Sequence, residues 1–195
     1  MIEFDEESHT YFVDGETVPS VTQILKAEGV VDDRWFTEFG RWRGSAVHRA
    51  IHLAAENRLD RRSLDPRIKP YLKAAESFQK TTKFFPAMVE QQVWEEAFRY
   101  CGTLDAVGYF ASANPCEPHI LVDYKTYDPQ PWTALQLAAY GRALDPKAVF
   151  RRIAVCLASD GTYRLKEFVL TEYVADVNTF LAMTVSHRWK LEHCD

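Results

Sequence analysis

Two charged residues stand at the end of an apolar run, and their spacing suits metal-assisted chemistry on an anion. The run Ile120–Val122 continues into Asp123, Tyr124 and Lys125. Consecutive apolar and β-branched residues predict a central strand, and side chains alternate faces along a strand, so Asp123 and Lys125 project from one side. A buried carboxylate and ammonium must pair with each other or bind charged species. A metal ion and an anionic substrate would meet that need, although a single D-x-K pair also fits an ordinary strand ending at the surface.

Polar residues at fixed spacing recur in three other segments. The strand-like segment Tyr100–Gly108 carries one acid, three residues after a glycine. A helix predicted over 44–57 begins with a glycine and has a histidine one turn later, and a helix predicted over 132–144 has a glutamine and a tyrosine one turn apart. The residues concerned are Gly102 and Asp105, Gly44 and His48, and Gln136 and Tyr140.

In sequence order these four pairs resemble the G-x-x-x-H, G-x-x-D, D-x-K and Q-x-x-x-Y motifs of the RecB-like branch of the PD-(D/E)XK nuclease superfamily. The resemblance covers most of the chain. It reaches Pro19–Leu25, which looks like the opening segment of phage-type and mitochondrial-genome-maintenance exonucleases of this branch. The family's motif begins with Pro-Asp, and in this chain Leu104 precedes Asp105 in place of the proline. This replacement is common in this branch.

The resemblance implies an α/β fold, in which a restriction-endonuclease-like core has a central mixed β-sheet flanked by helices. We expect one domain over 1–195, with 1–43 as an N-terminal hairpin and helix extension. The residues predict the hairpin at Thr10–Val18 through its D-G turn, and a helix from Ser20 through a capping box with Gln23. The strand after the loop Ser112–Pro118 should pair antiparallel with the segment Phe98–Phe110. Further elements are predicted over 70–78 (helix), 88–94, 149–157 and 163–169 (strands) and 171–191 (helix).

Hydrolysis of a phosphodiester needs an activated water, in-line attack and charge neutralisation, and one or two hard divalent cations supply all three. Magnesium prefers oxygen ligands, so two aspartates and a peptide carbonyl make a plausible partial cage. By resemblance, the ligands are Asp105, Asp123, the backbone carbonyl of Tyr124 and the imidazole of His48. A histidine ligand suggests that Mn²⁺ supports activity as well as Mg²⁺. Lys125, with Asp105 and Asp123, would be catalytic because its charge lies beside the attacking water and the scissile phosphate.

Glu90 and two arginines are further candidates with two interpretations each. Relatives of this branch often carry a metal-site acid where Glu90 stands, yet a solvent-facing strand glutamate has the same sequence signature. Arg41 and Arg43 lie among the aromatic residues of 35–43, which could stack on nucleic-acid bases or pack into the core. By resemblance, Gln136 and Tyr140 bind substrate near the active site and steer the DNA strand.

The hydrophobic content and the net charge of the chain indicate which classes of protein it can belong to. The chain has 195 residues, 47% of them hydrophobic, which suits one globular domain, and its net charge of −5 is unlike that of a nonspecific DNA coat. A local basic groove can still steer DNA. No apolar run has the length of a membrane span and the first residues are acidic, so we expect no membrane partner and a cytoplasmic location, in the host cytoplasm if the protein is phage-encoded.

Four cysteines are scattered without C-x-x-C spacing, which predicts buried thiols and neither a zinc ribbon nor a disulfide framework. Relatives that hold an iron–sulfur cluster have a tight C-terminal cysteine trio, which this chain lacks. We therefore expect no iron–sulfur cluster. The cysteines are Cys101, Cys116, Cys156 and Cys194.

These observations predict a metal-dependent deoxyribonuclease, acting as an exonuclease on single-stranded DNA or DNA ends in processing, repair or recombination. Its expected partners are DNA and a helicase, a recombinase or a single-strand-binding protein. The alternatives are a structure-selective endonuclease and a non-catalytic nucleic-acid-binding partner of a helicase or recombinase. A metallohydrolase for small phosphoesters is disfavoured because Gln136 and Tyr140 resemble a nucleic-acid-binding element.

Overall fold

The computed structural model of the chain describes residues 1–5, 8–34, 36–111 and 119–194. The predicted loop Ser112–Pro118, with Cys116, lies outside these residues. Among the cysteines that are described, Cys101 and Cys156 are buried free thiols as predicted, whereas Cys194 is exposed. In the described part of the chain, none of the helices combines the length and the apolar character that a bilayer crossing requires.

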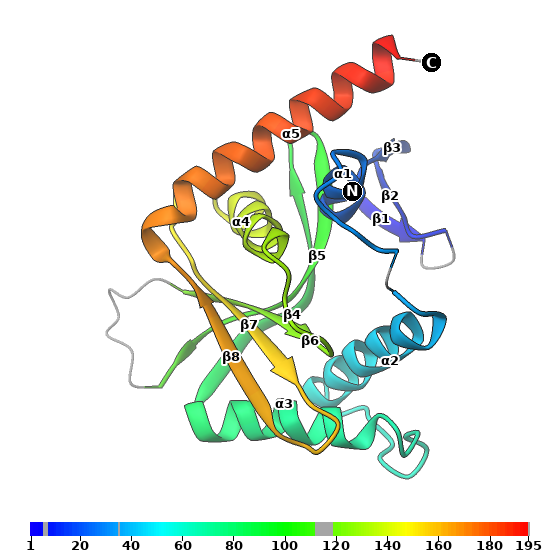
Figure 1. Cartoon of the computed structure of the whole chain (residues 1–195), viewed down its shortest axis with the longest axis vertical. Coiled ribbons are helices and arrows are strands. Elements are labelled where there is room, and N and C mark those ends of the chain that lie inside the picture. The colour runs from blue at the N-terminus through cyan, green and yellow to red at the C-terminus, as the bar shows by residue number, and fades with distance from the viewer. Residues whose placement is uncertain (6–7, 35, 112–118, 195) are drawn as a thin grey trace.

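A five-stranded mixed sheet forms the centre of the fold (Figure 1). β6 and β7 are parallel and the other neighbours are antiparallel, so the predicted α/β fold with a mixed sheet and flanking helices is confirmed, as is the antiparallel pairing of β5 with β6. The strand order is β4-β5-β6-β7-β8, with β4 at Phe84–Glu95, β5 at Tyr100–Phe110, β6 at Ile120–Lys125, β7 at Arg151–Leu157 and β8 at Tyr163–Phe168.

The N-terminal extension is a small antiparallel sheet fixed to the edge of β5. The predicted hairpin is present, and an additional strand pairs with it. Ser20 forms a bridge with Cys101, and the hydroxyl of Tyr11 lies 2.7 Å from the hydroxyl of Thr103. The extension therefore supplies one wall of the region around β5. Its strands are β1 (Ile2–Asp5), β2 (Thr10–Val13) and β3 (Glu16–Val18).

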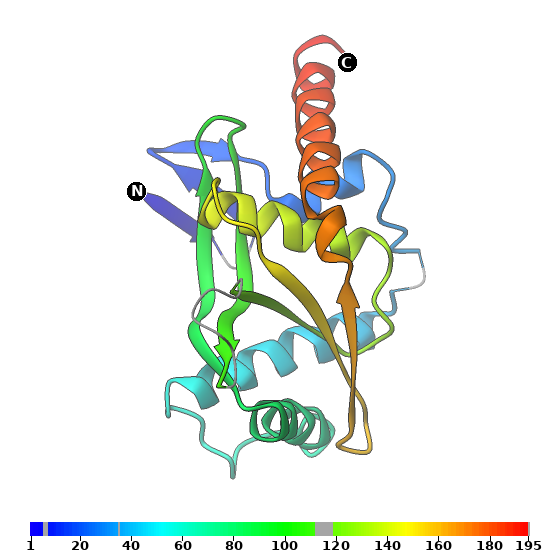
Figure 2. The same ribbon diagram turned by 90° about the vertical axis from the view of Figure 1, so that its left-hand side faces the viewer.

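Helices cover both faces of the central sheet, as Figures 1 and 2 show. One core cluster joins α1, α4 and α5 to a face that includes Leu104 and Leu121, and the other joins α2 and α3 to a face that includes Val122 and Tyr124. Because neighbouring residues of β6 point to opposite faces, Asp123 and Lys125 share the face of Leu121. The helices are α1 (Val21–Ala27), α2 (Glu38–Ala55), α3 (Lys69–Thr82), α4 (Trp132–Leu144) and α5 (Tyr173–His193), the last preceded by the 3-10 turn η1 (Leu170–Glu172).

Helix α2 begins at Glu38, earlier than the start that the sequence predicts at Gly44. The side chain of Thr37 caps this helix by accepting a hydrogen bond from the Gly40 N–H at 3.0 Å, and Glu38 lies in the first turn, where a negative charge stabilises a helix. The capping box predicted at Ser20 and Gln23 is confirmed at the start of α1. The earlier start of α2 makes Arg41 and Arg43 helical residues.

Candidate functional site

The site lies where β5 and β6 separate. Their ladder ends with the pair Ala106 and Val122, so Asp105 and Asp123 are not paired across the strands. The side chain of Asp105 takes the place of the missing ladder bond, because its Oδ2 accepts a hydrogen bond from the Tyr124 N–H at 2.6 Å. The fork therefore holds two carboxylates on adjacent strands, one in the middle of β5 and one near the end of β6, without pairing them across the ladder.

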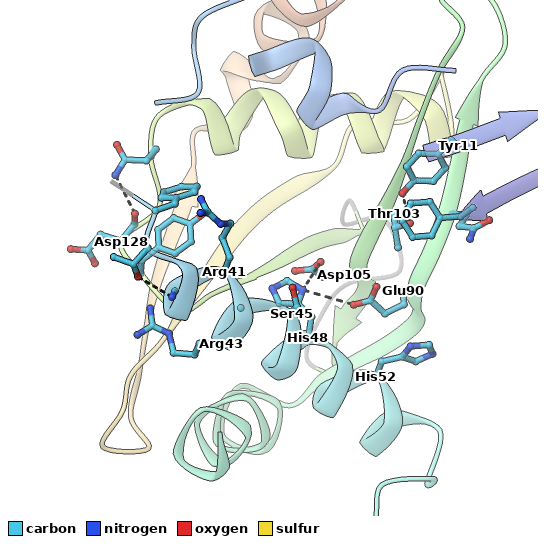
Figure 3. Close-up of a pocket in the computed structure, with 18 residues that line it drawn as sticks. Tyr11, Arg41, Arg43, Ser45, His48, His52, Glu90, Thr103, Asp105 and Asp128 are labelled. Atoms are coloured by element: carbon cyan, nitrogen blue, oxygen red, sulfur yellow. Dashed lines mark hydrogen bonds and ion pairs between the residues drawn. The ribbon is translucent and has the colours of Figure 1, made fainter. Parts of the chain in front are cut away.

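Three side chains from three elements form a group that could hold a metal ion (Figure 3). His48 comes from α2, Glu90 from β4 and Asp105 from β5, and their nitrogen and oxygen ligand atoms all lie within 4.8 Å of one another. His48 Nδ1 is 3.2 Å from Asp105 Oδ1 and 3.9 Å from Glu90 Oε1. We call these three residues the metal group. Glu90 thus faces His48, as a metal-site acid would, and is not a solvent-facing strand residue.

Glu90 reaches the group through an unusual backbone conformation. Its φ of 47° lies in the left-handed region, although its neighbours Val89 and Gln91 keep the register with Ala106 and Leu104. A residue with a Cβ loses about 1–2 kcal/mol in this conformation. Such strain concentrates at functional sites, where the surrounding structure holds it. Simple alternation along β4 does not predict this local turn of the backbone.

The orientation of His48 is set by a backbone carbonyl. Its Nε2 lies 2.8 Å from the Tyr124 carbonyl oxygen, and because that oxygen only accepts, Nε2 is the donor. Nδ1 therefore faces Asp105 and Glu90 and is the ring atom that a metal ion would use. A hydrogen bond at the other ring nitrogen is what fixes metal-binding histidines elsewhere. The Tyr124 carbonyl, which the resemblance assigns to the metal ion, therefore accepts a hydrogen bond from His48 in this structure.

Electrostatics within the metal group favour a charged histidine when no ion is bound. Burial opposes the charge, but the negative Asp105 and its hydrogen bond, together with Glu90, raise the pKa of His48 to about 9. Burial and the charge of Asp105 raise the pKa of Glu90 to about 7, with His48 acting in the opposite direction. Three groups that share their protons in this way form an anionic site whose full charge develops when a cation replaces the protons.

We expect metal binding to release a proton from His48. Since the pKa of His48 is about 9, Nδ1 is protonated at pH 8 and must lose its proton to become a ligand. Between about pH 7, where Glu90 has lost its proton, and pH 9 the apparent affinity for Mn²⁺ should rise by up to about tenfold per pH unit, and the dependence should level off above pH 9. Calorimetric titration at pH 8 in two buffers of different ionisation enthalpy should show release of about one proton per ion. The His48→Asn variant serves as the control, and equal heats in both buffers for the wild type would contradict a histidine ligand.

Asp123 and Lys125 form a buried ion pair next to the metal group. Their residues are 4% and 7% exposed, and Lys125 Nζ lies 2.9 Å from Asp123 Oδ1. Burial and the charge of Asp105 raise the pKa of Asp123 to about 6, against the effect of Lys125. Burial lowers the pKa of Lys125, but the charges of Asp123, Tyr127 and Asp105 and the hydrogen bond to Asp123 together outweigh it and keep the pKa above its usual value. Lys125 is therefore protonated at neutral pH.

The second carboxylate oxygen of Asp123 is buried and, among the described residues, has no hydrogen-bond partner. An unsatisfied buried oxygen costs about 1–3 kcal/mol, so such atoms usually mark a bound water or ion. Asp123 lies outside the metal group as the distances define it. Its free oxygen, one imidazole nitrogen and two carboxylates are nevertheless a donor set that suits Mg²⁺ or Mn²⁺.

Gln136 and Tyr140 stand behind Lys125. Gln136 Oε1 accepts a hydrogen bond from Lys125 Nζ at 3.3 Å, and Gln136 Nε2 donates to the Tyr140 hydroxyl at 3.2 Å and to Thr22 Oγ1 at 3.4 Å. Gln136 and Tyr140 are 7% and 6% exposed. The structure therefore places these residues so that they position the lysine. Sequence reasoning missed Thr22, whose only signal is that it belongs to the segment Pro19–Leu25.

Gly102 is required by the ring of Tyr140. A Cβ at Gly102 would lie 2.4 Å from Tyr140 Cε1, so Gly102→Ala must displace the ring and with it the hydrogen bond to Gln136. We expect a loss of about 1–3 kcal/mol in the free energy of unfolding, measured by urea titration. Gly44→Ala is the matched control, since its Cβ would meet nothing within 4 Å and alanine favours a helix by about 0.5–1 kcal/mol. Equal effects of the two substitutions would contradict the close packing.

Two cavities open onto these residues. The main cavity, of about 800 Å³, is lined by residues that include Tyr11, Arg41, His48, Glu90, Asp105 and Tyr127. The side cavity, of about 510 Å³, is lined by residues that include Thr22, Lys26, Phe36, Lys125, Trp132 and Gln136. The metal group thus faces the first space and the lysine faces the second. Figure 3 shows the metal group between Arg41 and Arg43 at one end of the main cavity and Tyr11 and Thr103 at the other.

The two candidate arginines differ in their surroundings. Arg43 is partly buried and donates a hydrogen bond to the Thr126 carbonyl at 3.1 Å, and its guanidinium lies 5.4 Å from the ring centroid of Tyr71. Arg41 is exposed and lines both cavities. Within the part of the chain that the structure describes, no carboxylate oxygen lies within 4.0 Å of its guanidinium nitrogens. Arg41 is therefore the freer of the two to contact an anion.

No protein-family model matches the sequence, and no match was found among curated proteins. The chemistry of the metal group, the buried Asp123–Lys125 pair and the two adjoining cavities therefore carry the functional conclusion.

Proposed function

We propose that this protein is a metal-dependent deoxyribonuclease, which hydrolyses phosphodiester bonds and acts as an exonuclease on single-stranded DNA or DNA ends. One observation carries the proposal: Asp123 and Lys125 are paired and buried at the fork beside the metal group, and a carboxylate oxygen of Asp123 has no hydrogen-bond partner among the residues that the structure describes. The mixed sheet with helices on both faces agrees with the proposed PD-(D/E)XK-type core. DNA processing with a helicase, recombinase or single-strand-binding protein is the proposed setting.

The residues of the site have separate roles in this proposal. His48, Glu90 and Asp105, with the free oxygen of Asp123, would hold one or two Mg²⁺ or Mn²⁺ ions. A bound divalent ion supplies an activated water and neutralises charge on phosphate oxygens. Lys125 holds a fixed positive charge at the edge of the side cavity, where it can bind a phosphate oxygen, and Gln136 keeps the ammonium in place. The Tyr124 carbonyl keeps His48 in the tautomer that presents Nδ1 to the cavity.

The proposal is tested with single-stranded and duplex DNA labelled separately at each end, in Mg²⁺, Mn²⁺ or EDTA. We expect metal-dependent release of short products, and the label that is released first gives the polarity. Lys125→Met should bind Mn²⁺ but cut about 10²–10³-fold more slowly, because it removes a charge that stabilises the transition state. Lys147→Met, at an exposed lysine outside both cavities, is the matched control. DNA binding without cleavage in any metal would refute the nuclease and favour a binding partner of a helicase or recombinase.

A further inference from the structure

Phe36, Tyr127 and Arg41 line both cavities and so form the wall between them. The ring centroids of Phe36 and Tyr127 lie 5.4 Å apart with an interplanar angle of 48°, and both side chains are partly exposed. The two aromatic residues come from segments far apart in the sequence, one just before α2 and the other just after β6. We call Phe36 and Tyr127 the shared aromatic pair.

The shared aromatic pair lies next to the groups that would act on a phosphate. Lys125 Nζ is 5.9 Å from the ring centroid of Tyr127, while the metal group faces the main cavity on the other side of the wall. A phosphate that touches both Lys125 and an ion in the metal group must therefore lie near this wall. The nucleotides on its two sides then occupy the two cavities.

Charge on both sides of the wall suits a phosphate backbone. Arg41 reaches both cavities, Arg43 lines the main cavity, and Lys26 and Lys125 line the side cavity. Lys26 is paired with Asp33 at 2.6 Å and Lys125 with Asp123 at 2.9 Å, so Arg41, for which no ion pair is found among the described residues, is the cation most available to phosphate oxygens. Cations along a groove together with partly exposed rings are the features by which proteins hold single strands.

We infer that the shared aromatic pair is a base-stacking site, which takes one unpaired nucleobase as the adjoining phosphates pass from one cavity to the other. The inference rests on the proposed function and specifies its substrate as single-stranded nucleic acid. A base in a duplex is already stacked on its neighbours, so only an unpaired base offers a free face to these rings. Phe36 and Tyr127 therefore select single strands, and they do so beside the bond to be cut.

Other exposed aromatic pairs lack this position. Phe39 and Trp42 lie on α2, but neither lines the main or the side cavity, and the guanidinium of Arg67 already covers Trp42 at 4.4 Å. Phe85 and Tyr109 are stacked and about half exposed at the far end of β4 and β5, away from both cavities. Phe85 and Tyr109 therefore provide a matched control for the loss of an exposed aromatic side chain.

The test measures kcat/KM for end-labelled single strands that carry one abasic residue at successive positions. For the wild type we expect one or two positions at which the missing base lowers kcat/KM about 5- to 150-fold, the range of one base–aromatic stack. The double variant Phe36→Leu and Tyr127→Leu should show a similar loss on intact DNA and no further loss on the abasic strands. Its preference for single strands over duplex should fall by the same factor. Tyr127→Phe, which keeps an aromatic ring, should retain the wild-type kcat/KM, and Tyr109→Leu should not change it either.

Thermal unfolding of each variant shows whether a loss reflects misfolding, and the aromatic replacement Tyr127→Phe separates stacking from a structural role. If the wild type cuts no DNA in any metal, the proposed function fails and takes this inference with it. If the wild type cuts intact and abasic strands equally well, or if the leucine variant and the abasic residue act additively, the nuclease stands and the stacking site is refuted.

Discussion

Asp105→Asn should reduce metal-dependent cleavage by about 10³-fold or more, because it removes several kcal/mol of metal-assisted stabilisation while keeping the shape of the site. The carboxylate is engaged at both oxygens, Oδ1 with His48 at 3.2 Å and Oδ2 with the Tyr124 N–H at 2.6 Å. An asparagine amide can keep both contacts, accepting from Tyr124 with its oxygen and donating to a neutral His48 with its nitrogen. Only the charge is lost.

The expected cause is electrostatic. Burial raises the pKa of Asp105, but the positive charge and hydrogen bond of His48 outweigh it and hold the pKa below its usual value, so the group is ionised at neutral pH. Asp128→Asn is the matched control, because Asp128 lines the same cavity but is exposed and paired with Arg164. We expect the control to stay within about threefold of the wild type. An Asp105→Asn enzyme that keeps more than a tenth of the wild-type rate would contradict the assignment.

Asp176→Asn should destabilise the fold by about 3 kcal/mol, which lowers Tm by about 6–12 °C in a chain of this size. Arg152 is fully buried on β7, and its Nη1 lies 2.5 Å from Asp176 Oδ2 on α5. The guanidinium also donates to the carbonyls of Ala134 and Val169. Removing the carboxylate leaves a buried positive charge without its counter-ion, which is one of the costlier single changes in a protein.

A double substitution separates the cost of an unpaired charge from the value of the pair. Arg152→Met with Asp176→Leu should be more stable than Asp176→Asn alone, because an apolar replacement of a buried ion pair removes the desolvation penalty. Glu167→Gln, at a more exposed pair with Arg151 at 2.8 Å, should change stability by less than about 1 kcal/mol. Urea unfolding of the four proteins measures all three differences. A double variant less stable than Asp176→Asn would show that Arg152 stabilises the fold through its other contacts.

The parts of the site that depend on local periodicity could be predicted from the sequence. The two-residue repeat of a strand places Asp123 and Lys125 on one face, and the four-residue spacing of a helix places Gln136 beside Tyr140, as the structure has them. The capping box at Ser20 and the D-G hairpin are equally local. Each of these features is fixed by residues that are near one another in the chain.

Features set by contacts between distant segments could not be predicted in this way. The side chain of Glu90 faces His48 because Glu90 itself has a left-handed backbone conformation within β4. The hydrogen bond between His48 and the Tyr124 carbonyl depends on how α2 crosses the end of β6. Gln136, which the resemblance places against the substrate, makes its hydrogen bonds with Lys125 and Thr22 inside the protein. Such contacts are set by tertiary packing, which a local pattern of residue types does not specify.

The most direct test of the metal group is a titration with Mn²⁺ in which bound ion and DNA cleavage are measured in the same samples. Electron paramagnetic resonance of the free ion gives the occupancy, and end-labelled single-stranded DNA gives the rate. We expect the rate to rise in proportion to bound Mn²⁺, and Asp105→Asn and Glu90→Gln to weaken binding and cleavage together. Full cleavage in EDTA, or Mn²⁺ binding that neither substitution changes, would contradict a catalytic metal ion held by His48, Glu90 and Asp105.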